Sequence, residues 1–137
     1  DDHHLTVYSP VEPDSDAVPA RRRRPVLLLH GRTWSCVPVY HFQGGTHHDD
    51  DNRSLLDSLM TASDDIIPYA VDFRGFGGTP SDESETVTPR RCVEDTVTVL
   101  EWIAARHPED EAPVLFGWSQ GALVAQLVGQ EYPSMMR

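Results

Sequence analysis

The segment Pro113-Val-Leu-Phe-Gly-Trp-Ser-Gln-Gly-Ala-Leu-Val-Ala125 decides how the rest of this sequence is interpreted. A short apolar run at residues 114–116 precedes the pentapeptide Gly117-Trp-Ser-Gln-Gly121. An Ala/Leu/Val segment with helical spacing, residues 122–130, follows it. This order predicts a strand, a sharp turn and a helix, with Ser119 at the tip of the turn.

The pattern G-x-S-x-G between a strand and a helix is typical of a nucleophile elbow. In such a turn the serine backbone is strained, and its hydroxyl stands clear of the sheet. Gly117 and Gly121 would leave room where the strand and helix backbones approach each other. The Gln120 amide would point toward an oxyanion beside Ser119. The alternative is a glycine-rich turn whose serine only caps the helix.

Length, composition and charge limit the fold and the partners of this chain. Its 137 residues suffice for one domain with a core, and 39% hydrophobic with 24% charged residues is typical of a soluble globular protein. The net charge of −11 argues against nucleic acid and anionic membranes as partners. No apolar run approaches the roughly 20 residues that span a bilayer. Cys36 and Cys92 are expected to be free thiols.

The remaining chain alternates between predicted strands and helices. Residues 5–8, 25–30 and 66–72 are predicted strands, and the last two are continuous apolar runs suited to a sheet buried on both faces. Helices are predicted over residues 54–62 and, behind the cap Thr88, over residues 89–107. In the latter an apolar stripe joins Val93, Val97, Leu100 and Ala104, and Trp102 and Ile103 widen it. Residues 32–45 are predicted to form a long loop.

This alternation predicts an α/β fold with a doubly wound, mostly parallel sheet. Ligands of such sheets bind outside the carboxyl ends of the strands. His30, Asp72 and Ser119 all fall at such ends, so the fold would gather them along one rim.

Two charged segments have competing interpretations. The run Arg21–Arg24 could bind an anion, but a solvated start of a strand that offsets nearby acids is favoured. Residues 47–51, His-His-Asp-Asp-Asp, are of metal-binding types. Consecutive residues of an extended chain point in opposite directions, so a solvated loop is favoured there and no metal site is predicted.

Three motifs in this order resemble the α/β-hydrolase superfamily: His30-Gly31, Asp72-Phe-Arg-Gly-Phe-Gly77, and Gly117-Trp-Ser-Gln-Gly121. The resemblance covers residues 25–133, with residues 1–24 as a lead-in of strand and loop. It implies that residues 1–137 form the amino-terminal part of a single domain of this kind.

The resemblance also implies roles for individual residues. Ser119 would be the nucleophile, and the backbone N–H groups of Gln120 and Arg32 would form the oxyanion hole, with Thr33 as the alternative to Arg32. Asp72 and Arg74 correspond to a turn that shapes the sheet. The resemblance implies no cofactor and no metal, and a small-molecule acyl substrate as the partner.

One feature departs from the family pattern. The triad acid and histidine follow the serine in this superfamily, but only Glu131 and no histidine follow Ser119. His30 is expected to brace the neighbouring loop, and His107 to lie far from the rim. The chain is therefore expected to stop after the elbow helix, with the acid and histidine beyond residue 137, and to be inactive alone.

Three functions are consistent with these residues. The first is a serine hydrolase that acts on an ester or a related acyl substrate through an acyl-enzyme. The alternatives are an acyltransferase with the same intermediate and a non-catalytic member that binds a ligand or partner. The sequence leaves the substrate and the oligomeric state open. No signal peptide is visible, which favours the cytoplasm, but the chain starts at Asp1 without Met and could be a processed piece.

Overall fold

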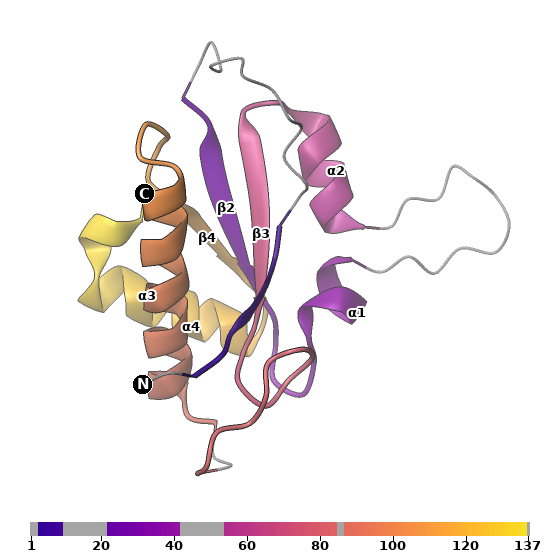
Figure 1. Cartoon of the computed structure of the whole chain (residues 1–137), viewed down its shortest axis with the longest axis vertical. Helices are drawn as coiled ribbons and strands as arrows, with labels where there is room; N and C mark the ends of the chain where they lie inside the picture. Colours follow the sequence, from indigo (N-terminus) through magenta and orange to yellow (C-terminus); the bar gives the residue numbers. More distant parts are fainter. Residues whose placement is uncertain (1–2, 10–21, 42–53, 85–86, 137) are drawn as a thin grey trace, which may run out of the picture.

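The computed structural model describes residues 3–9, 22–41, 54–84 and 87–136, which form a twisted sheet between two helical layers (Figure 1). Its strands are β1 (Thr6–Tyr8), β2 (Arg24–Leu29), β3 (Ile66–Asp72) and β4 (Val114–Gly117), in the order β1-β3-β2-β4. β2 pairs in parallel with β3 and β4, whereas β1 pairs antiparallel with β3. The predicted mostly parallel sheet is confirmed.

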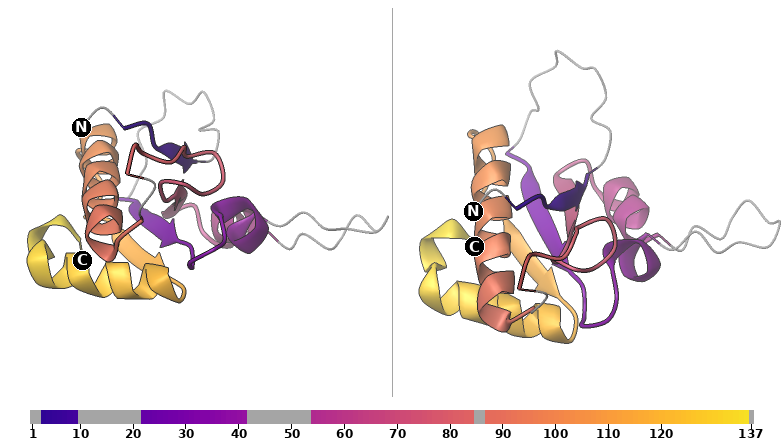
Figure 2. Two further views of the ribbon diagram at one scale, coloured as in Figure 1. Left: turned by 90° about the horizontal axis from the view of Figure 1, so that it is seen from below. Right: turned by 60° about the horizontal axis from the view of Figure 1, so that its bottom comes forward.

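Helices cover both faces of the sheet, as expected of a doubly wound fold (Figures 1 and 2). The short helix α1 (Cys36–Tyr40) and α2 (Leu55–Ala62) lie on one side. On the other side lie α3 (Pro89–Arg106) and α4 (Gln120–Glu131), which is followed by the 3-10 turn Pro133–Met135. In the described residues no helix combines the length and the apolar character needed to cross a membrane.

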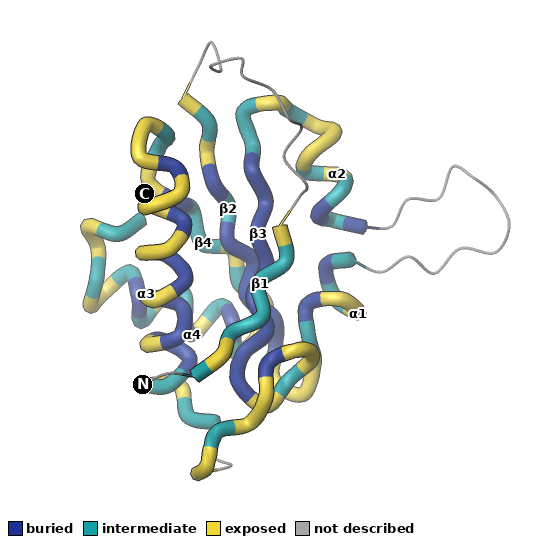
Figure 3. The backbone as a smooth tube through the Cα atoms, in the orientation of Figure 1, coloured by how far each residue is buried: buried dark blue, intermediate teal, exposed yellow. Residues whose placement is uncertain are grey.

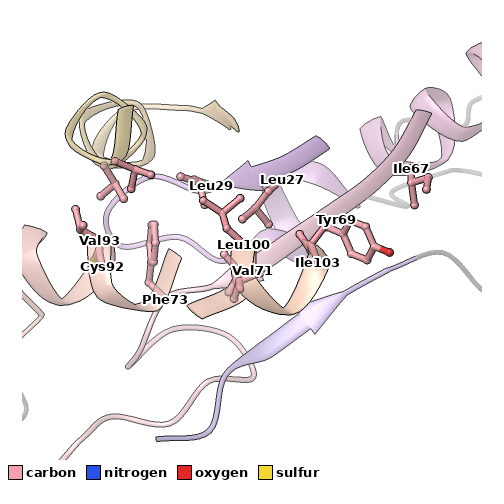
Figure 4. Close-up of a cluster of buried hydrophobic side chains, with 13 residues drawn as sticks. Leu27, Leu29, Ile67, Tyr69, Val71, Phe73, Cys92, Val93, Leu100 and Ile103 are labelled. Atoms are coloured by element: carbon pink, nitrogen blue, oxygen red, sulfur yellow. The ribbon is translucent and has the colours of Figure 1, made fainter. Parts of the chain in front are cut away.

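The central strand β2 is apolar because its side chains alternate between two cores. Leu27 and Leu29 belong to the larger core, which α3 and α4 cover (Figure 4). Leu28 belongs to the smaller core beneath α1 and α2. The buried residues accordingly concentrate along β2, β3 and the inner side of α3 (Figure 3).

Side-chain caps set the starts of two of the predicted helices, α2 and α3. The Thr88 hydroxyl accepts from the Arg91 N–H at 3.2 Å, and Pro89 occupies the first position of α3. The Ser54 hydroxyl accepts from the Asp57 N–H at 3.1 Å and begins α2. Both helices therefore agree with the prediction to within one residue at each end.

The buried face of α3 differs from the predicted stripe. Val93, Leu100 and Ile103 are buried as predicted. Trp102 and Ala104 are exposed, and Val97 is only half-buried. The residues that α3 buries are Cys92, Val93, Asp95, Thr96, Val99, Leu100 and Ile103. The stripe left out Asp95 and Thr96, which are buried through polar contacts with Arg74 and with the Cys92 carbonyl.

The prediction of a loop through residues 32–45 was wrong for residues 36–40, which form α1, and residues 42–45 lie outside the described residues. The Asp72 carboxylate accepts from the Cys36 N–H at 2.6 Å and so satisfies a donor at the helix start. Cys36 and Tyr40, four residues apart, are both buried against the sheet. Pro38 lies within the first turn, where it removes no helical hydrogen bond.

The two charged segments are only partly within the described residues. Residues 47–51 and Arg21 lie outside them. Arg23 pairs with Asp110 at 3.2 Å and Arg24 with Glu111 at 2.8 Å, which agrees with a strand start that offsets nearby acids. The described residues contain no cluster of three His, Cys, Asp or Glu side chains that could hold a metal ion.

A buried ion pair ties the turn after β3 to α3. The Arg74 guanidinium donates to both carboxylate oxygens of Asp95, through Nε at 2.9 Å and through Nη2. Its Nη1 donates to Asp82 at 2.8 Å, and Arg91 also pairs with Asp82. The side chains of Arg74 and Asp95 are only 5% and 3% exposed, so each charge depends on its partner.

We expect Asp95→Ala to lower the free energy of unfolding by about 1.5–3 kcal/mol, because the buried Arg74 guanidinium loses both Asp95 oxygens and keeps its contact with Asp82. The matched control is Glu94→Ala on the same helix, whose solvent-exposed pair with Arg90 should contribute little to the free energy of unfolding. Urea unfolding monitored by circular dichroism measures both. Equal losses in the two variants would contradict the structural role of the buried pair.

Candidate active site

The Ser119 backbone adopts a conformation that is uncommon for a residue with a side chain. Its φ is 55° and its ψ is −118°. Thr33, at φ 67°, is the only other non-glycine residue with positive φ among the described residues. Such strain tends to concentrate at functional sites. Thr33 lies in the loop after β2, and Ser119 lies in the turn after β4. These two segments meet at the carboxyl ends of the parallel strands.

Two glycines allow the strand and the helix to meet at the turn Gly117–Gly121, called the elbow below. A Cβ on Gly117 would lie 2.3 Å from the carbonyl of Gly121, and one on Gly121 would lie 2.1 Å from the Leu29 oxygen. A side-chain carbon does not approach backbone atoms so closely. The crossing of β4 and α4 next to β2 therefore requires glycine at both positions.

The Ser119 side chain does not serve as a helix cap. Ser119 precedes the first residue of α4, yet its side chain makes no capping hydrogen bond, and the residue is exposed. This arrangement differs from a turn in which the serine only caps the helix. It leaves the Ser119 side chain free of the helix backbone on a residue that is accessible from solvent.

The start of α4 supplies an unpaired donor beside Ser119. Gln120 is the first residue of α4, and no acceptor within the described part of the chain takes its amide N–H. The Gln120 side chain instead reaches α3, where its Nε2 lies 3.6 Å from the Cys92 sulfur. The positive end of the helix dipole and this free amide favour an anion at the elbow.

The loop after β2 lies directly against the elbow. A Cβ on Gly31 would lie 2.8 Å from the Trp118 ring and 3.2 Å from the Ser119 Cβ. Arg32, the next residue, is exposed, and its carbonyl accepts from the Thr33 hydroxyl at 2.6 Å. The structure thus brings the loop containing Arg32 beside Ser119 and Gln120, although these residues are far apart in the sequence.

His30 is held as a neutral ring by two backbone groups. Its Nε2 accepts from the Phe73 N–H at 3.0 Å, so its Nδ1 carries the proton and donates to the Gly31 carbonyl at 2.7 Å. Burial lowers the pKa of His30 below its ordinary value of 6.5. Since both nitrogens are engaged, His30 joins the loop to the turn after β3 and has no nitrogen left for Ser119.

Asp72 connects three separate segments through one buried carboxylate. Oδ1 accepts from the Cys36 N–H, and Oδ2 accepts from the Tyr8 hydroxyl at 2.8 Å and the Gly78 N–H at 2.9 Å. Burial, followed by this hydrogen bond, raises the pKa of Tyr8 to about 12. These hydrogen bonds use both carboxylate oxygens of Asp72 to hold neighbouring segments together. The sequence pattern did not predict that Tyr8 and Cys36 would be among its partners.

The other candidate acid and base lie far from Ser119. His107 ends α3 and contacts the Tyr69 hydroxyl, Asp110 and Arg23, which precedes β2. This is the amino end of the parallel strands, whereas Ser119 follows the carboxyl end of β4. Glu131 is the last residue of α4, at the opposite end of this helix from Ser119, and it pairs with Arg90.

Comparison with known proteins supports this fold. Residues 26–134 match the model of a family described as the alpha/beta hydrolase family. No curated protein is a significant sequence match to the chain. Similar solved structures include Est1E from Butyrivibrio proteoclasticus with bound ferulic acid, at a TM-score of 0.66 and 16% identity. An esterase from Pyrococcus furiosus matches at a TM-score of 0.60 and 23% identity.

The alignments cover most of this chain but less than half of each of these solved structures. They cover 96% of the chain and 45% of Est1E, and 84% of the chain and 40% of the Pyrococcus esterase. A serine hydrolase without a lid from Xanthomonas campestris, at a TM-score of 0.52 and 22% identity, is matched over 92% of the chain and 49% of its own length. At these identities the similarity establishes the fold.

We expect Gly121→Ala to destabilise the protein by about 1–3 kcal/mol or more, because its Cβ collides with the Leu29 carbonyl. Gly129→Ala on the same helix is the control. Its Cβ would have only ordinary contacts with Met136, at 3.9 Å or more, so it should stabilise α4 by about 0.5–1 kcal/mol. Thermal unfolding compares the two. A stable Gly121→Ala protein would rule out the close approach at the elbow.

The lowered pKa of His30 predicts a specific pH dependence. The unfolded chain binds a proton at this residue near pH 6.5, before the folded protein does, so stability falls as pH drops through that value toward the folded pKa. We expect His30→Gln to lose less stability than the wild type between about pH 7.5 and about pH 5. Urea midpoints at both pH values measure this. Parallel pH profiles would contradict the assignment of a neutral His30.

Proposed function

The chain belongs to the alpha/beta hydrolase family, and from that premise we propose that the protein is a serine hydrolase with Ser119 as its nucleophile. The substrate is an ester or a related acyl compound. The observation that carries this proposal is the strained, exposed Ser119, whose side chain does not cap α4 although it stands at the helix start.

The first chemical step is the attack of the Ser119 oxygen on the substrate carbonyl carbon. The carbonyl oxygen becomes an oxyanion, and the amides of Gln120 and Arg32 donate to it. Such donors are already oriented before the reaction, and each contributes about 10²–10³ in rate in comparable sites. The free N–H of Gln120 and the contact of Gly31 with Ser119 support this assignment.

The hydroxyl proton needs a general base, since a neutral serine is a weak nucleophile. Both nitrogens of His30 are engaged with the backbone, and His107 lies at the other end of the sheet. We propose that the base is a histidine beyond residue 137, together with its acid partner, and that water then releases the acyl group. The alignments reach less than half of the length of Est1E and of the Pyrococcus esterase, which supports a base outside residues 1–137.

The known structures favour an ester among the possible acyl substrates. One is an esterase by name, and Est1E was solved with ferulic acid bound. A ligand-binding member without catalysis would need neither an accessible serine nor the strain that holds it at the elbow. We therefore prefer hydrolysis to a binding function.

We expect Ser119 of the full-length protein to react covalently with a fluorophosphonate probe, and Ser119→Ala to abolish labelling. Ester hydrolysis by the variant should fall close to background, because loss of a triad member leaves only about 10³–10⁴-fold catalysis over water. Ser134→Ala, which changes an exposed serine in the 3-10 turn, is the control and should label normally. Unchanged labelling of Ser119→Ala would remove Ser119 as the nucleophile.

A further inference from the structure

An apolar groove of about 430 Å³ opens beside the elbow, between α1, the start of α2 and β4. Its lining consists of six residues, Trp34, Val39, Tyr40, Leu55, Phe116 and Trp118. None of them carries a charge, and four are aromatic. The volume falls in the range of about 300–1,000 Å³ that is common for small-molecule sites.

Three large aromatic side chains of this groove are half-exposed. Trp34 and Phe116 are each 48% exposed and Trp118 is 47% exposed. A single exposed apolar residue needs no explanation, but a contiguous group of them marks a site of binding. In the described part of the chain these rings are therefore available to an apolar group that reaches the elbow.

The aromatic rings hold one another in a fixed arrangement. Trp34 and Trp118 pack edge to face with their centroids 6.2 Å apart, and Tyr40 and Phe116 do so at 6.3 Å. The Tyr40 hydroxyl donates to the Leu29 carbonyl at 2.7 Å, so its polar end is already satisfied by β2. The ring edges and faces that remain open favour a planar aromatic group, which packs edge to face or offset on such surfaces.

The groove adjoins the atoms proposed to react. Trp118 directly precedes Ser119, and its ring lies over Gly31, where an added Cβ would be 2.8 Å away. Trp34 lies two residues after Arg32, and its ring contacts the Trp118 ring. A substrate carbonyl at Ser119 would therefore have its neighbouring group next to the aromatic surface.

We propose that this groove binds a planar aromatic group of the substrate, so that the protein acts on esters with an aromatic acyl or alcohol part. That the substrate contains an ester bond rests on the proposed hydrolase function. The groove itself does not depend on Ser119 being the nucleophile, so its binding can be measured apart from the reaction.

The catalytic test uses the full-length protein and two matched pairs of esters. Methyl 3-phenylpropanoate is compared with methyl 3-cyclohexylpropanoate, and benzyl acetate with cyclohexylmethyl acetate. We expect kcat/KM to favour the aromatic member of one pair by about tenfold or more. The pair that shows the preference identifies the acyl or the alcohol part as the group in the groove. No preference in either pair overturns the proposal.

Two tryptophan variants locate the preference. Trp34→Leu should reduce it by about tenfold. Trp102→Leu should leave it unchanged, because Trp102 is 43% exposed but lies on α3, across the sheet from the groove. Equal effects of the two variants would place the aromatic selectivity elsewhere and contradict the proposal.

A binding experiment separates this inference from the proposed function. Calorimetry with Ser119→Ala compares 3-phenylpropanoate with 3-cyclohexylpropanoate, and benzyl alcohol with cyclohexylmethanol. Tighter binding of an aromatic member, lost in Ser119→Ala/Trp34→Leu, supports the groove even if Ser119 proves not to be the nucleophile. Equal binding within both pairs, or no binding, overturns it even if Ser119 labels with a fluorophosphonate.

Discussion

The close approach of three backbone segments at the Leu29 carbonyl constrains the rest of this structure. The oxygen lies 2.1 Å from the position that a Cβ on Gly121 would take. It accepts from the Trp118 N–H at 3.1 Å and from the Tyr40 hydroxyl at 2.7 Å. One carbonyl of the central strand therefore fixes α4, the end of β4 and α1 together. Because backbones meet there, small changes at these positions displace whole elements, including the one that carries Ser119.

The polar residues at this rim hold the loops and leave the elbow free. His30 joins the Gly31 carbonyl to the Phe73 amide, and Asp72 joins α1, β1 and the Gly78 turn. Each uses its polar atoms on backbone or neighbouring side chains. The strained Ser119 can persist because such contacts determine the positions of the segments around it.

The sequence predicted the parts of the fold that depend on local patterns. Apolar runs and glycine spacing identified the strands and the elbow, and Thr88 identified the start of α3. It missed α1, whose first donor is satisfied by Asp72, 36 residues away. It also left Asp95 out of the buried face of α3, since this carboxylate is paired with Arg74 from another turn. The aromatic groove was missed for the same reason: its residues meet only in the folded chain.

The central claim is that the elbow presents Ser119 to an oxyanion held by the Gln120 and Arg32 amides. The most direct measurement is a crystal structure of the full-length protein after reaction with an alkyl fluorophosphonate. The account predicts phosphorus bonded to the Ser119 oxygen, with a phosphonyl oxygen about 2.7–3.1 Å from both amide nitrogens. A phosphonyl oxygen directed to solvent, or an adduct on another residue, would contradict it.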